Sequence, residues 1–250
     1  MNRKAHLAPQ FRSVAIVGVG GTGSYLAQGL AKLVAGYRLP LAVTLIDPDS
    51  IEVKNCARQN FLAYEIGQPK AEALAYRLNQ QYGLRFAAFV GPGVKAGLFS
   101  APKTLLVTCV DTVEARQTFK DFGPWLDLGN AEATGQALYG NTAKRAELTA
   151  EAKKWATTPT VAHLPGPYLL AGMAKLKTAK AAPSCADHPF AEQGCFVNEW
   201  AAVAGLTILH QLLVKGQLTT PSIYFDSAKG HMAPLYITRD YLTEKLKGEK

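Results

Sequence analysis

Cysteine is scarce in this sequence, and its cysteines are not closely paired. Four occur in 250 residues, and no Cys-x-x-Cys is present. Structural zinc sites commonly take cysteines in such pairs, so we expect no structural zinc. The five histidines are scattered and no two have metal-ligand spacing; His210, within an apolar segment, is expected to be a core residue. These absences argue against a metal site built from cysteine or histidine.

Long apolar runs are also absent. No stretch reaches the roughly 18 apolar residues that a membrane span requires, and none follows the first residues as in a signal peptide. We therefore expect a soluble, cytoplasmic protein that does not contact membranes. No internal repeat or low-complexity segment is evident, and 250 residues can bury a substantial core.

Acidic residues are outnumbered, and the net charge is +8. The lysines and arginines are scattered, with part of the excess in 144–180, and aromatic residues do not interleave with them. This pattern disfavours nucleic-acid binding. A basic surface could steer an acidic protein partner or simply be solvated.

Residues 14–23, Val-Ala-Ile-Val-Gly-Val-Gly-Gly-Thr-Gly, form the most informative motif, because an apolar strand runs into a Gly-x-Gly-x-x-Gly turn that opens a helix. Gly18 permits the tight turn, Gly20 lets the backbone approach phosphate oxygens, and Gly23 lets the helix pack on its strand. The helix N-terminus adds free N–H groups and a favourable dipole. The loop predicts a nucleotide site without naming the nucleotide.

Polar segments after the next apolar strand favour a triphosphate. Residues 47–49 read Asp-Pro-Asp, and an acid at this position contacts a ribose in dinucleotide-binding folds. Residues 55–59 read Asn-Cys-Ala-Arg-Gln and 67–70 read Gly-Gln-Pro-Lys, neither of which belongs to a dehydrogenase motif. Arginine forms paired, charge-assisted hydrogen bonds and lysine supplies a point charge, so Arg58 and Lys70 fit a polyphosphate.

A further apolar strand over 104–110 delivers Asp111 at its carboxyl end, the edge where ligands of doubly wound sheets bind. Magnesium is usually held by one or two carboxylates together with substrate phosphates. A single aspartate at this edge is therefore sufficient, and we expect Asp111 to hold Mg²⁺.

In this order the motifs resemble the ThiF/MoeB/HesA family, relatives of ubiquitin-activating enzymes that adenylate the carboxyl terminus of a small β-grasp protein. The match runs from Val14 to about Asn130, and the last of its motifs is Asp111 with Arg116 five residues on. A narrower resemblance, to the ThiF-like protein of the PRTRC gene cluster, rests on Pro-Ser-Cys at 183–185 and Gln-Gly-Cys-Phe-Val-Asn at 193–198.

The family resemblance implies roles for the matching residues. Asp47 would hold the ribose and Asp111 the magnesium, while Gln59 and Arg116 would support the residues around the phosphates. The phosphates themselves would be bound by Asn55, Arg58 and Lys70. The predicted nucleotide site comprises Gly18, Gly20, Gly21, Gly23, Asp47, Asp49, Asn55, Arg58, Gln59, Lys70 and Asp111.

The implied reaction brings two anions together, because a carboxylate attacks the α-phosphate of ATP while pyrophosphate leaves. Arg58, Lys70, the amides near Gly20 and Mg²⁺ on Asp111 would neutralise the phosphate oxygens. Little acid–base chemistry is needed. Arg58 and Lys70 are therefore the predicted catalytic cations.

The cysteines decide whether a covalent step follows. Cys109, within a strand, and Cys56, where the family commonly has leucine, are predicted to be structural. The family places its acceptor cysteine where Cys185 and Cys195 lie, and a thiolate needs a pKa lowered by a histidine or a helix start. His188 is near Cys185, which we prefer to Cys195 as the thioester site. A disulfide between these two, or no catalytic cysteine, remains open.

The pattern of elements predicts an α/β fold, a Rossmann-like doubly wound and mainly parallel sheet with a long crossover segment and C-terminal antiparallel strands. We expect an ATP-binding half over 1–130, a crossover segment over 131–196, and a helix and strands over 197–250 that complete the same domain. Helices are predicted at 22–35, 67–82, 112–121 and 197–214. Strands are predicted at 13–18, 41–47, 85–90, 104–110 and 125–128, with a hairpin of 222–226 and 234–237.

Three functions remain open. The first is ATP-dependent adenylation of a ubiquitin-like protein, supplied as a separate chain because no β-grasp segment ending in Gly-Gly is fused here; relatives are commonly homodimers. The second is an NAD-dependent oxidoreductase, which explains the glycine loop and Asp47 but leaves Arg58, Lys70 and Asp111 without roles. The third is a non-catalytic scaffold that binds a nucleotide and a partner protein.

Overall fold

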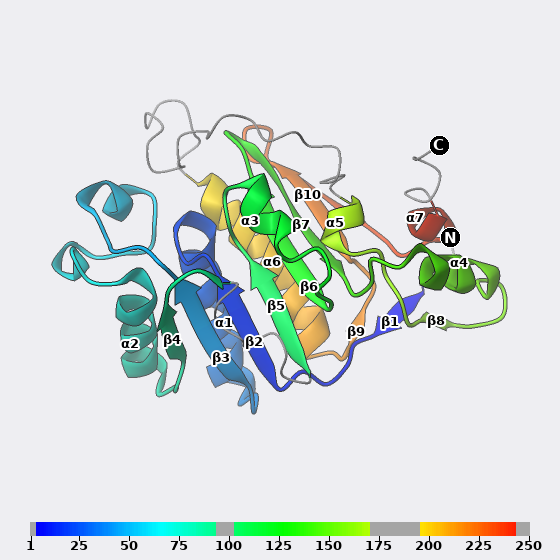
Figure 1. Ribbon diagram of the computed structural model, residues 1–250, viewed down its shortest axis with the longest axis horizontal. Coiled ribbons are helices and arrows are strands. Elements are labelled where there is room, and N and C mark those ends of the chain that lie inside the picture. The colour runs from blue at the N-terminus through cyan, green and yellow to red at the C-terminus, as the bar shows by residue number, and fades with distance from the viewer. Residues whose placement is uncertain (1–3, 94–102, 171–195, 244–250) are drawn as a thin grey trace.

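Residues 4–93, 103–170 and 196–243 are described by the computed structural model, and they build an eight-stranded sheet with helices on its faces (Figure 1). The strand order is β11-β10-β7-β6-β5-β2-β3-β4. The five neighbouring strands β6, β5, β2, β3 and β4 are parallel, and β7, β10 and β11 extend the sheet by antiparallel pairing. Their bounds are β2 (Ser13–Val17), β3 (Ala42–Asp47), β4 (Ala87–Val90), β5 (Thr104–Thr108), β6 (Trp125–Asn130), β7 (Thr134–Gly140), β10 (Ser222–Asp226) and β11 (His231–Leu235).

The main core lies on the face covered by α1 (Gly21–Tyr37), α2 (Lys70–Tyr82) and α6 (Val197–Leu213), and α6 runs behind the strands in Figure 1. Leu26 and Leu30 of α1 recur at the helical spacing of four and are fully buried. Each such leucine contributes about 2 kcal/mol of burial energy. Gly29 lets α6 approach α1 closely, because a Cβ there would lie 2.1 Å from Leu206 Cδ1.

The opposite face carries a smaller core and shorter helices. Phe119, just after α3 (Val113–Gln117), packs there with Trp125, and Tyr168 of α5 (Pro167–Leu170) lies against the same cluster. The remaining helices are α4 (Arg145–Lys153) and α7 (Arg239–Thr243), with 3₁₀ turns η1 (Val53–Ala57) and η2 (Ala63–Glu65) between β3 and α2. No described helix is long and apolar enough to cross a membrane.

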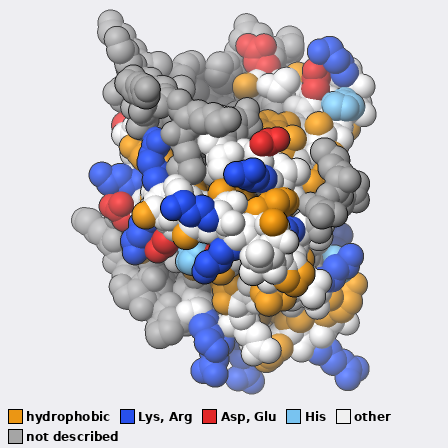
Figure 2. All heavy atoms as spheres, turned by 90° about the vertical axis from the view of Figure 1, so that its right-hand side faces the viewer, with side chains coloured by type: hydrophobic (Ala, Val, Ile, Leu, Met, Phe, Trp, Pro, Cys, Tyr) orange, Lys and Arg blue, Asp and Glu red, His pale blue; other side chains and the backbone are white. Residues whose placement is uncertain are grey.

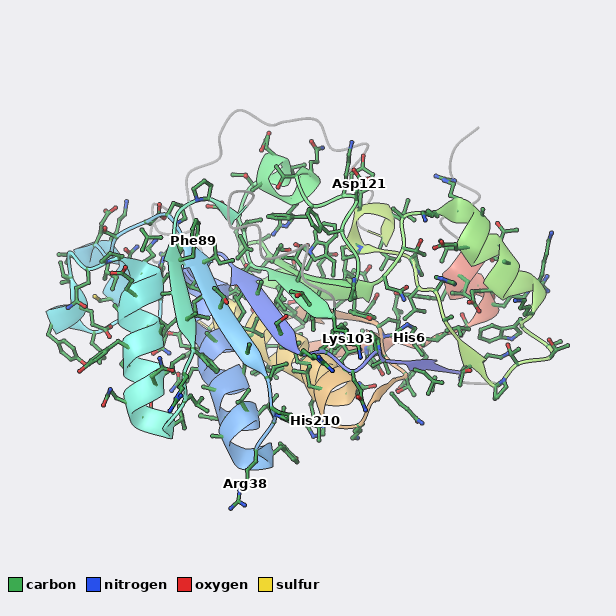
Figure 3. All side chains as sticks on the ribbon, turned by 60° about the horizontal axis from the view of Figure 1, so that its bottom comes forward. His6, Arg38, Phe89, Lys103, Asp121 and His210 are labelled. Carbon is green, nitrogen blue, oxygen red and sulfur yellow. The ribbon has the colours of Figure 1, made fainter. Side chains whose placement is uncertain are left out.

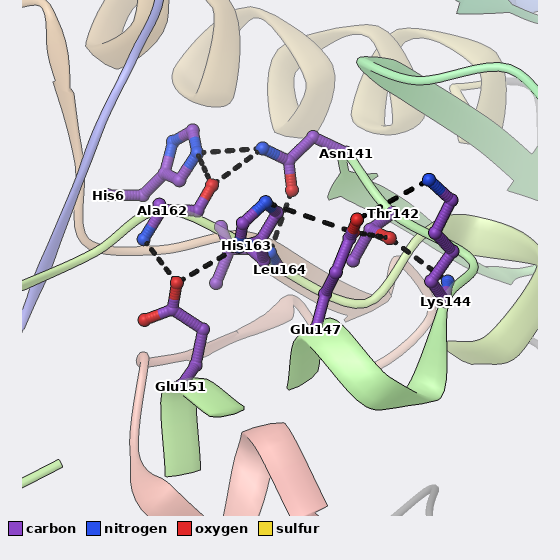
Figure 4. A network of polar contacts seen from close by, with 9 residues as sticks. All are labelled: His6, Asn141, Thr142, Lys144, Glu147, Glu151, Ala162, His163 and Leu164. Carbon is purple, nitrogen blue, oxygen red and sulfur yellow. Dashed lines mark hydrogen bonds and ion pairs between the residues drawn. The ribbon is translucent and has the colours of Figure 1, made fainter. Parts of the chain in front are cut away.

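A separate three-stranded sheet joins β1 (Ala5–Leu7) to β8 (Thr160–Val161) and β9 (Gln217–Leu218). His6 of β1 lies in a polar network, with Nε2 3.1 Å from both the Ala162 carbonyl oxygen and Asn141 Nδ2 (Figure 4). Burial lowers the pKa of His6 to about 4, so the ring is neutral at physiological pH. Glu151 of α4 accepts from the Ala162 N–H at 3.1 Å and lies 3.0 Å from His163 Nδ1. The network therefore fastens this small sheet to α4.

Surface charge is dispersed on the face that carries α4 and the small sheet. Lysine and arginine side chains lie among acidic and apolar ones in this view (Figure 2). For example, Nζ of Lys144, just before α4, lies 3.5 Å from Oε1 of Glu147 on that helix. On α6, His210 is half-buried, and its Nε2 lies 3.3 Å from the Tyr37 hydroxyl near the end of α1 (Figure 3). His210 thus lies at the rim between α1 and α6 and outside the described core, so the prediction of a core histidine is wrong.

The predicted fold class is confirmed, with its parallel strands and the C-terminal antiparallel strands. The structure differs within the predicted crossover, since residues 134–140 form β7 between β6 and β10. Gly135 and Gly140 concealed this strand, because glycine usually marks loops. Here both allow close packing: a Cβ would lie 2.3 Å from the Phe225 ring at Gly135 and 2.0 Å from the Pro165 carbonyl oxygen at Gly140.

The bounds of one helix and one strand differ from those predicted. The helix predicted at 112–121 is only the five-residue α3, capped by the Thr112 hydroxyl, which accepts from the Ala115 N–H at 3.2 Å. The second strand of the C-terminal hairpin is β11 at His231–Leu235, earlier than the predicted 234–237. The α4 helix also lies within the predicted crossover segment, for which no helix was predicted.

Candidate functional site

A cavity of about 460 Å³ opens at the carboxyl ends of the parallel strands. It lies beside β2, whose neighbours are β3 on one side and β5 on the other, so the chain reverses direction across the sheet at this point. Such a switch point is where doubly wound folds bind ligands. Its wall includes the glycine loop, residues 47–49, the η1 segment, Lys70 and Asp111.

The glycine loop turns sharply between β2 and α1. Gly18 has a φ of +82°, and a Cβ there would lie 2.9 Å from the Cys109 carbonyl oxygen. Gly23 is more constrained, because its Cβ would lie 1.9 Å from the Gly18 carbonyl oxygen. Gly20 is the N-cap residue of α1, and no side-chain hydrogen bond caps the helix there. Gly20 and Gly21 both line the cavity. The amino end of α1 therefore opens into the cavity, where it favours an anion.

Asp47 ties the glycine loop to the following turn. Its Oδ2 accepts from the Val19 N–H at 2.7 Å, and its Oδ1 accepts from the Asp49 N–H at 2.9 Å. The side chain is buried, and desolvation raises the pKa of Asp47 despite these bonds. Asp47 borders the cavity, and contact with a ribose remains a prediction.

Lys70 places a buried ammonium group at the cavity wall. It begins α2 after Pro69, and its side chain is 8% exposed. Its Nζ donates to Asp49 Oδ2 at 2.9 Å, while its backbone N–H donates to the Asp49 carbonyl oxygen at 2.9 Å. Asp49 is 63% exposed, so water screens this ion pair and the ammonium can bind a phosphate as well.

Residues 55–59 form another side of the cavity. Asn55 is buried and its Oδ1 accepts from the Glu52 N–H at 2.8 Å, which caps η1. The Gln59 amide lies against Gly20, 3.7 Å from the position of a Cβ there, and its Oε1 is buried without a described hydrogen-bond partner. Arg58 is buried too, but it is not among the described residues that line the cavity.

Asn60 fixes the position of this segment. Its N–H donates to Ser24 Oγ at 3.0 Å, and its Nδ2 donates to Gln28 Oε1 at 2.7 Å, both on α1. Arg77 of α2 donates to the Asn60 carbonyl oxygen and pairs with Glu65 Oε1 at 3.0 Å. Helices α1 and α2 therefore both hold Asn60, the residue that follows Arg58 and Gln59.

Asp111 is exposed and lines the cavity just after β5. Among residues 4–93, 103–170 and 196–243, no group of three His, Cys, Asp or Glu side chains is arranged to hold a metal ion. One exposed carboxylate fits Mg²⁺ that takes most of its ligands from phosphates and water. Asp111 thus suits the predicted magnesium only when a nucleotide is bound with it.

Several cavity residues were missing from the predicted site, among them Thr22, Asn130 and Asn198. The Thr22 hydroxyl donates toward Asn130 Oδ1 at 3.3 Å and Asn198 Oδ1 at 3.2 Å, and Asn130 Nδ2 donates to Asn198 Oδ1 at 3.1 Å. Asn198 Nδ2 reaches the Arg58 carbonyl oxygen at 3.3 Å. Asn198 comes from the start of α6, and only its place in the 193–198 motif marked it in the sequence.

The cysteines divide between described and undescribed segments. Cys56 and Cys109 pack against the main core, and burial raises the pKa of the Cys109 thiol. The packing of both cysteines against the core agrees with the structural roles predicted for them. Cys185, Cys195 and His188 lie outside the described residues, so the thioester site remains a prediction.

A groove of about 370 Å³ adjoins the nucleotide-sized cavity and is lined in part by Gly129, Thr134 and Tyr224. Arg116 and Asn130 line both spaces. Arg116 is held at this junction by Asp127, with Nε 3.2 Å from Oδ1. Arg116 therefore lies where the cavity and the groove meet.

Residues 9–151 match the ThiF family. The tRNA threonylcarbamoyladenosine dehydratase of Escherichia coli (strain K12) is 41% identical over 68 residues, which are 27% of this chain and 24% of that protein. The ubiquitin-like modifier-activating enzyme 5 of Xenopus laevis is 31% identical over 140 residues, 48% of this chain and 34% of that protein. The chain thus covers about a third or less of the length of these relatives.

Solved structures agree with the observed architecture. Escherichia coli MccB in complex with MccA has a TM-score of 0.56 at 16% identity, covering 91% of this chain and 64% of that one. The same enzyme with ATP has a TM-score of 0.55 at 17% identity, with coverages of 91% and 64%. PaaA has a TM-score of 0.54 at 15% identity, with coverages of 90% and 64%. At these identities the similarity establishes the fold, and the narrower PRTRC resemblance stays a prediction.

Proposed function

Because the chain belongs to the ThiF family, we propose that it is an ATP-dependent enzyme that adenylates a carboxylate. The observation that carries this proposal is the cavity at the switch point of the sheet. There the open amino end of α1, the buried Lys70 ammonium and the exposed Asp111 carboxylate border one space. This set of groups suits a nucleotide polyphosphate with Mg²⁺.

The residues around the cavity have complementary roles in the proposed reaction. The N–H groups at Gly20 and Gly21 and the Lys70 ammonium would neutralise phosphate oxygens as the carboxylate approaches. Asp111 would hold Mg²⁺, which supplies further charge neutralisation when bound. Asp47 fixes the glycine loop, and in the proposal it also accepts from a ribose hydroxyl. Preorganised charge, rather than proton transfer, thus drives the step.

We further propose that the carboxylate is the carboxyl terminus of a separate ubiquitin-like protein, which enters along the groove beside Arg116. The groove's continuity with the cavity supports this proposal. Among the similar proteins, one is named as an activating enzyme for ubiquitin-like modifiers, and MccB was solved with MccA bound. Transfer to Cys185 or Cys195 as a thioester, and a homodimeric enzyme, are further parts of the proposal.

Calorimetric titration of the purified protein with ATP and Mg²⁺, and separately with NAD, tests the nucleotide assignment. We expect saturable binding of Mg²⁺–ATP and none of NAD. Binding of NAD alone would favour an oxidoreductase. Binding of ATP without later pyrophosphate exchange, once a protein substrate is in hand, would favour a nucleotide-binding scaffold.

Arg58→Ala tests whether the buried arginine serves the phosphates. We expect ATP affinity to fall about tenfold while adenosine affinity is unchanged, since a charge-assisted bond to phosphate would be lost. Arg85→Ala, at an exposed position away from the cavity, is the control. An equal loss for both ligands would make Arg58 a purely structural residue.

Asp111→Asn tests the magnesium assignment. Mg²⁺ should strengthen ATP binding to the wild type, and we expect this enhancement to fall about tenfold in the variant because a neutral amide is a weak magnesium ligand. Asp111 is exposed, so the melting temperature should not change. A full magnesium effect in the variant would remove Asp111 from the site. Asp121→Asn, also exposed but outside the cavity lining, is the matched control.

A further inference from the structure

Arg116 lies where the nucleotide cavity meets the adjoining groove. Of the described residues, Arg116 and Asn130 line both spaces. In the proposed reaction the α-phosphate and the carboxylate meet at such a junction. A cation here can contact oxygens whose negative charge must be neutralised for the two anions to approach.

Two contacts orient the guanidinium of Arg116. Its Nε donates to Asp127 Oδ1 at 3.2 Å, and its Nη2 donates to the Leu128 carbonyl oxygen at 3.2 Å. Both acceptors belong to β6, and the arginine side chain is only 16% exposed. A guanidinium is planar with five donors in a fixed fork, so these bonds also fix the direction of its remaining N–H groups.

Asp127 is itself held by a chain of hydrogen bonds inside the sheet. The Thr108 hydroxyl of β5 donates to Asp127 Oδ1 at 2.6 Å, and the Trp125 indole N–H donates to that hydroxyl at 2.7 Å. Asp127 is fully buried, and its Oδ2 has no hydrogen-bond partner among the described residues. The carboxylate is thus locked in one orientation while one of its oxygens is left unsatisfied.

The buried pair of Asp127 and Arg116 contributes little to the free energy of folding. Burial raises the pKa of Asp127, because desolvation outweighs the opposing effect of Arg116. A buried carboxylate–guanidinium pair is often no more stable than apolar residues of similar volume. An orienting role for the pair accounts for its presence better than the energy of folding does.

We propose that Asp127 is a positioning residue that holds Arg116 in the orientation needed to bind the α-phosphate of the nucleotide. Trp125 and Thr108 extend this support into the sheet. The inference rests on the proposed adenylation and adds to it the group that meets the reacting phosphate. Arg116 contacts the substrate, and Asp127 acts only through Arg116.

Calorimetry with AMP and adenosine tests the proposal, because the two ligands differ only in the α-phosphate. The quantity to compare is the ratio of their affinities, which loss of folded protein does not alter. We expect this ratio to fall about tenfold in Arg116→Met, through loss of a charge-assisted bond, and equally in Asp127→Leu. The double variant should lose no more than either single variant, since both remove the same contact.

Asp127→Asn is the conservative variant that distinguishes a role in orienting Arg116 from a role in fold stability alone. It keeps an Oδ1 acceptor for Arg116 and Thr108, so its affinity ratio should stay close to that of the wild type. An unchanged ratio in Arg116→Met, or a loss in Asp127→Asn as large as in Arg116→Met, would overturn the proposal. An unchanged ratio in a folded Asp127→Leu would overturn it as well, and Arg116→Met and Asp127→Asn can still refute the proposal when Asp127→Leu does not fold. Failure of the wild type to bind any adenine nucleotide would instead refute the proposed function.

Discussion

Replacing Gly23 with alanine is expected to destabilise the protein by roughly 3 kcal/mol or more, a loss typical of severe overpacking. The added Cβ would lie 1.9 Å from the Gly18 carbonyl oxygen. That oxygen belongs to the backbone of the glycine loop, so no side-chain rotation can relieve the clash. The start of α1 would have to move away from β2, and the open helix terminus at the cavity would move with it.

Gly36→Ala is the matched control for Gly23→Ala. Gly36 lies in the last turn of α1, where an added Cβ would meet nothing within 4 Å. Because glycine lowers helix stability, this variant should gain up to about 1 kcal/mol. Urea unfolding of both variants gives the comparison. Free energies of unfolding that agree within the error of the method would show that the loop can relax around a Cβ at Gly23.

The predictable part of the site consists of groups that lie close together in the sequence. The glycine loop follows β2 directly, and Asp47 and Asp111 each come at or just after the end of a parallel strand. Since carboxyl ends of parallel strands share one edge of a sheet, chain order alone brings these residues together. The glycine loop, Asp47 and Asp111 accordingly border the same cavity in the structure.

The remaining part depends on packing between distant segments. Asn198 reaches Thr22 across 176 positions of sequence because α6 packs against α1. Asp127 was concealed within an apolar strand pattern, where one polar residue signals nothing about the arginine it holds. Arg58 illustrates the converse: its motif predicted a cavity residue, whereas the described lining includes its neighbour Gln59. Sequence spacing gives the order of groups along the chain, but not which side chain of a buried turn faces the ligand.

Lys70→Met is expected to weaken ATP binding about 100-fold while leaving adenosine binding unchanged. Methionine keeps most of the length of the side chain but removes the ammonium group, with its charge and its hydrogen bond to Asp49, from the cavity wall. Asp49 loses its partner, but at 63% exposure water replaces that contact at little cost. The melting temperature should therefore change little. Calorimetry with Mg²⁺–ATP and with adenosine measures the expected difference.

Lys229→Met provides the matched control for Lys70→Met. Lys229 also forms an ion pair with an aspartate, with Nζ 3.0 Å from Asp226 Oδ2, but it is exposed at the β10–β11 hairpin and lies outside the cavity lining. Loss of that pair should leave ATP affinity unchanged, because the long-range effect of one exposed charge is screened by salt. Equal weakening of ATP by both variants would mean that net charge, rather than contact with phosphate, governs binding. Equal weakening of ATP and adenosine in Lys70→Met would instead assign Lys70 to the structure of the cavity wall.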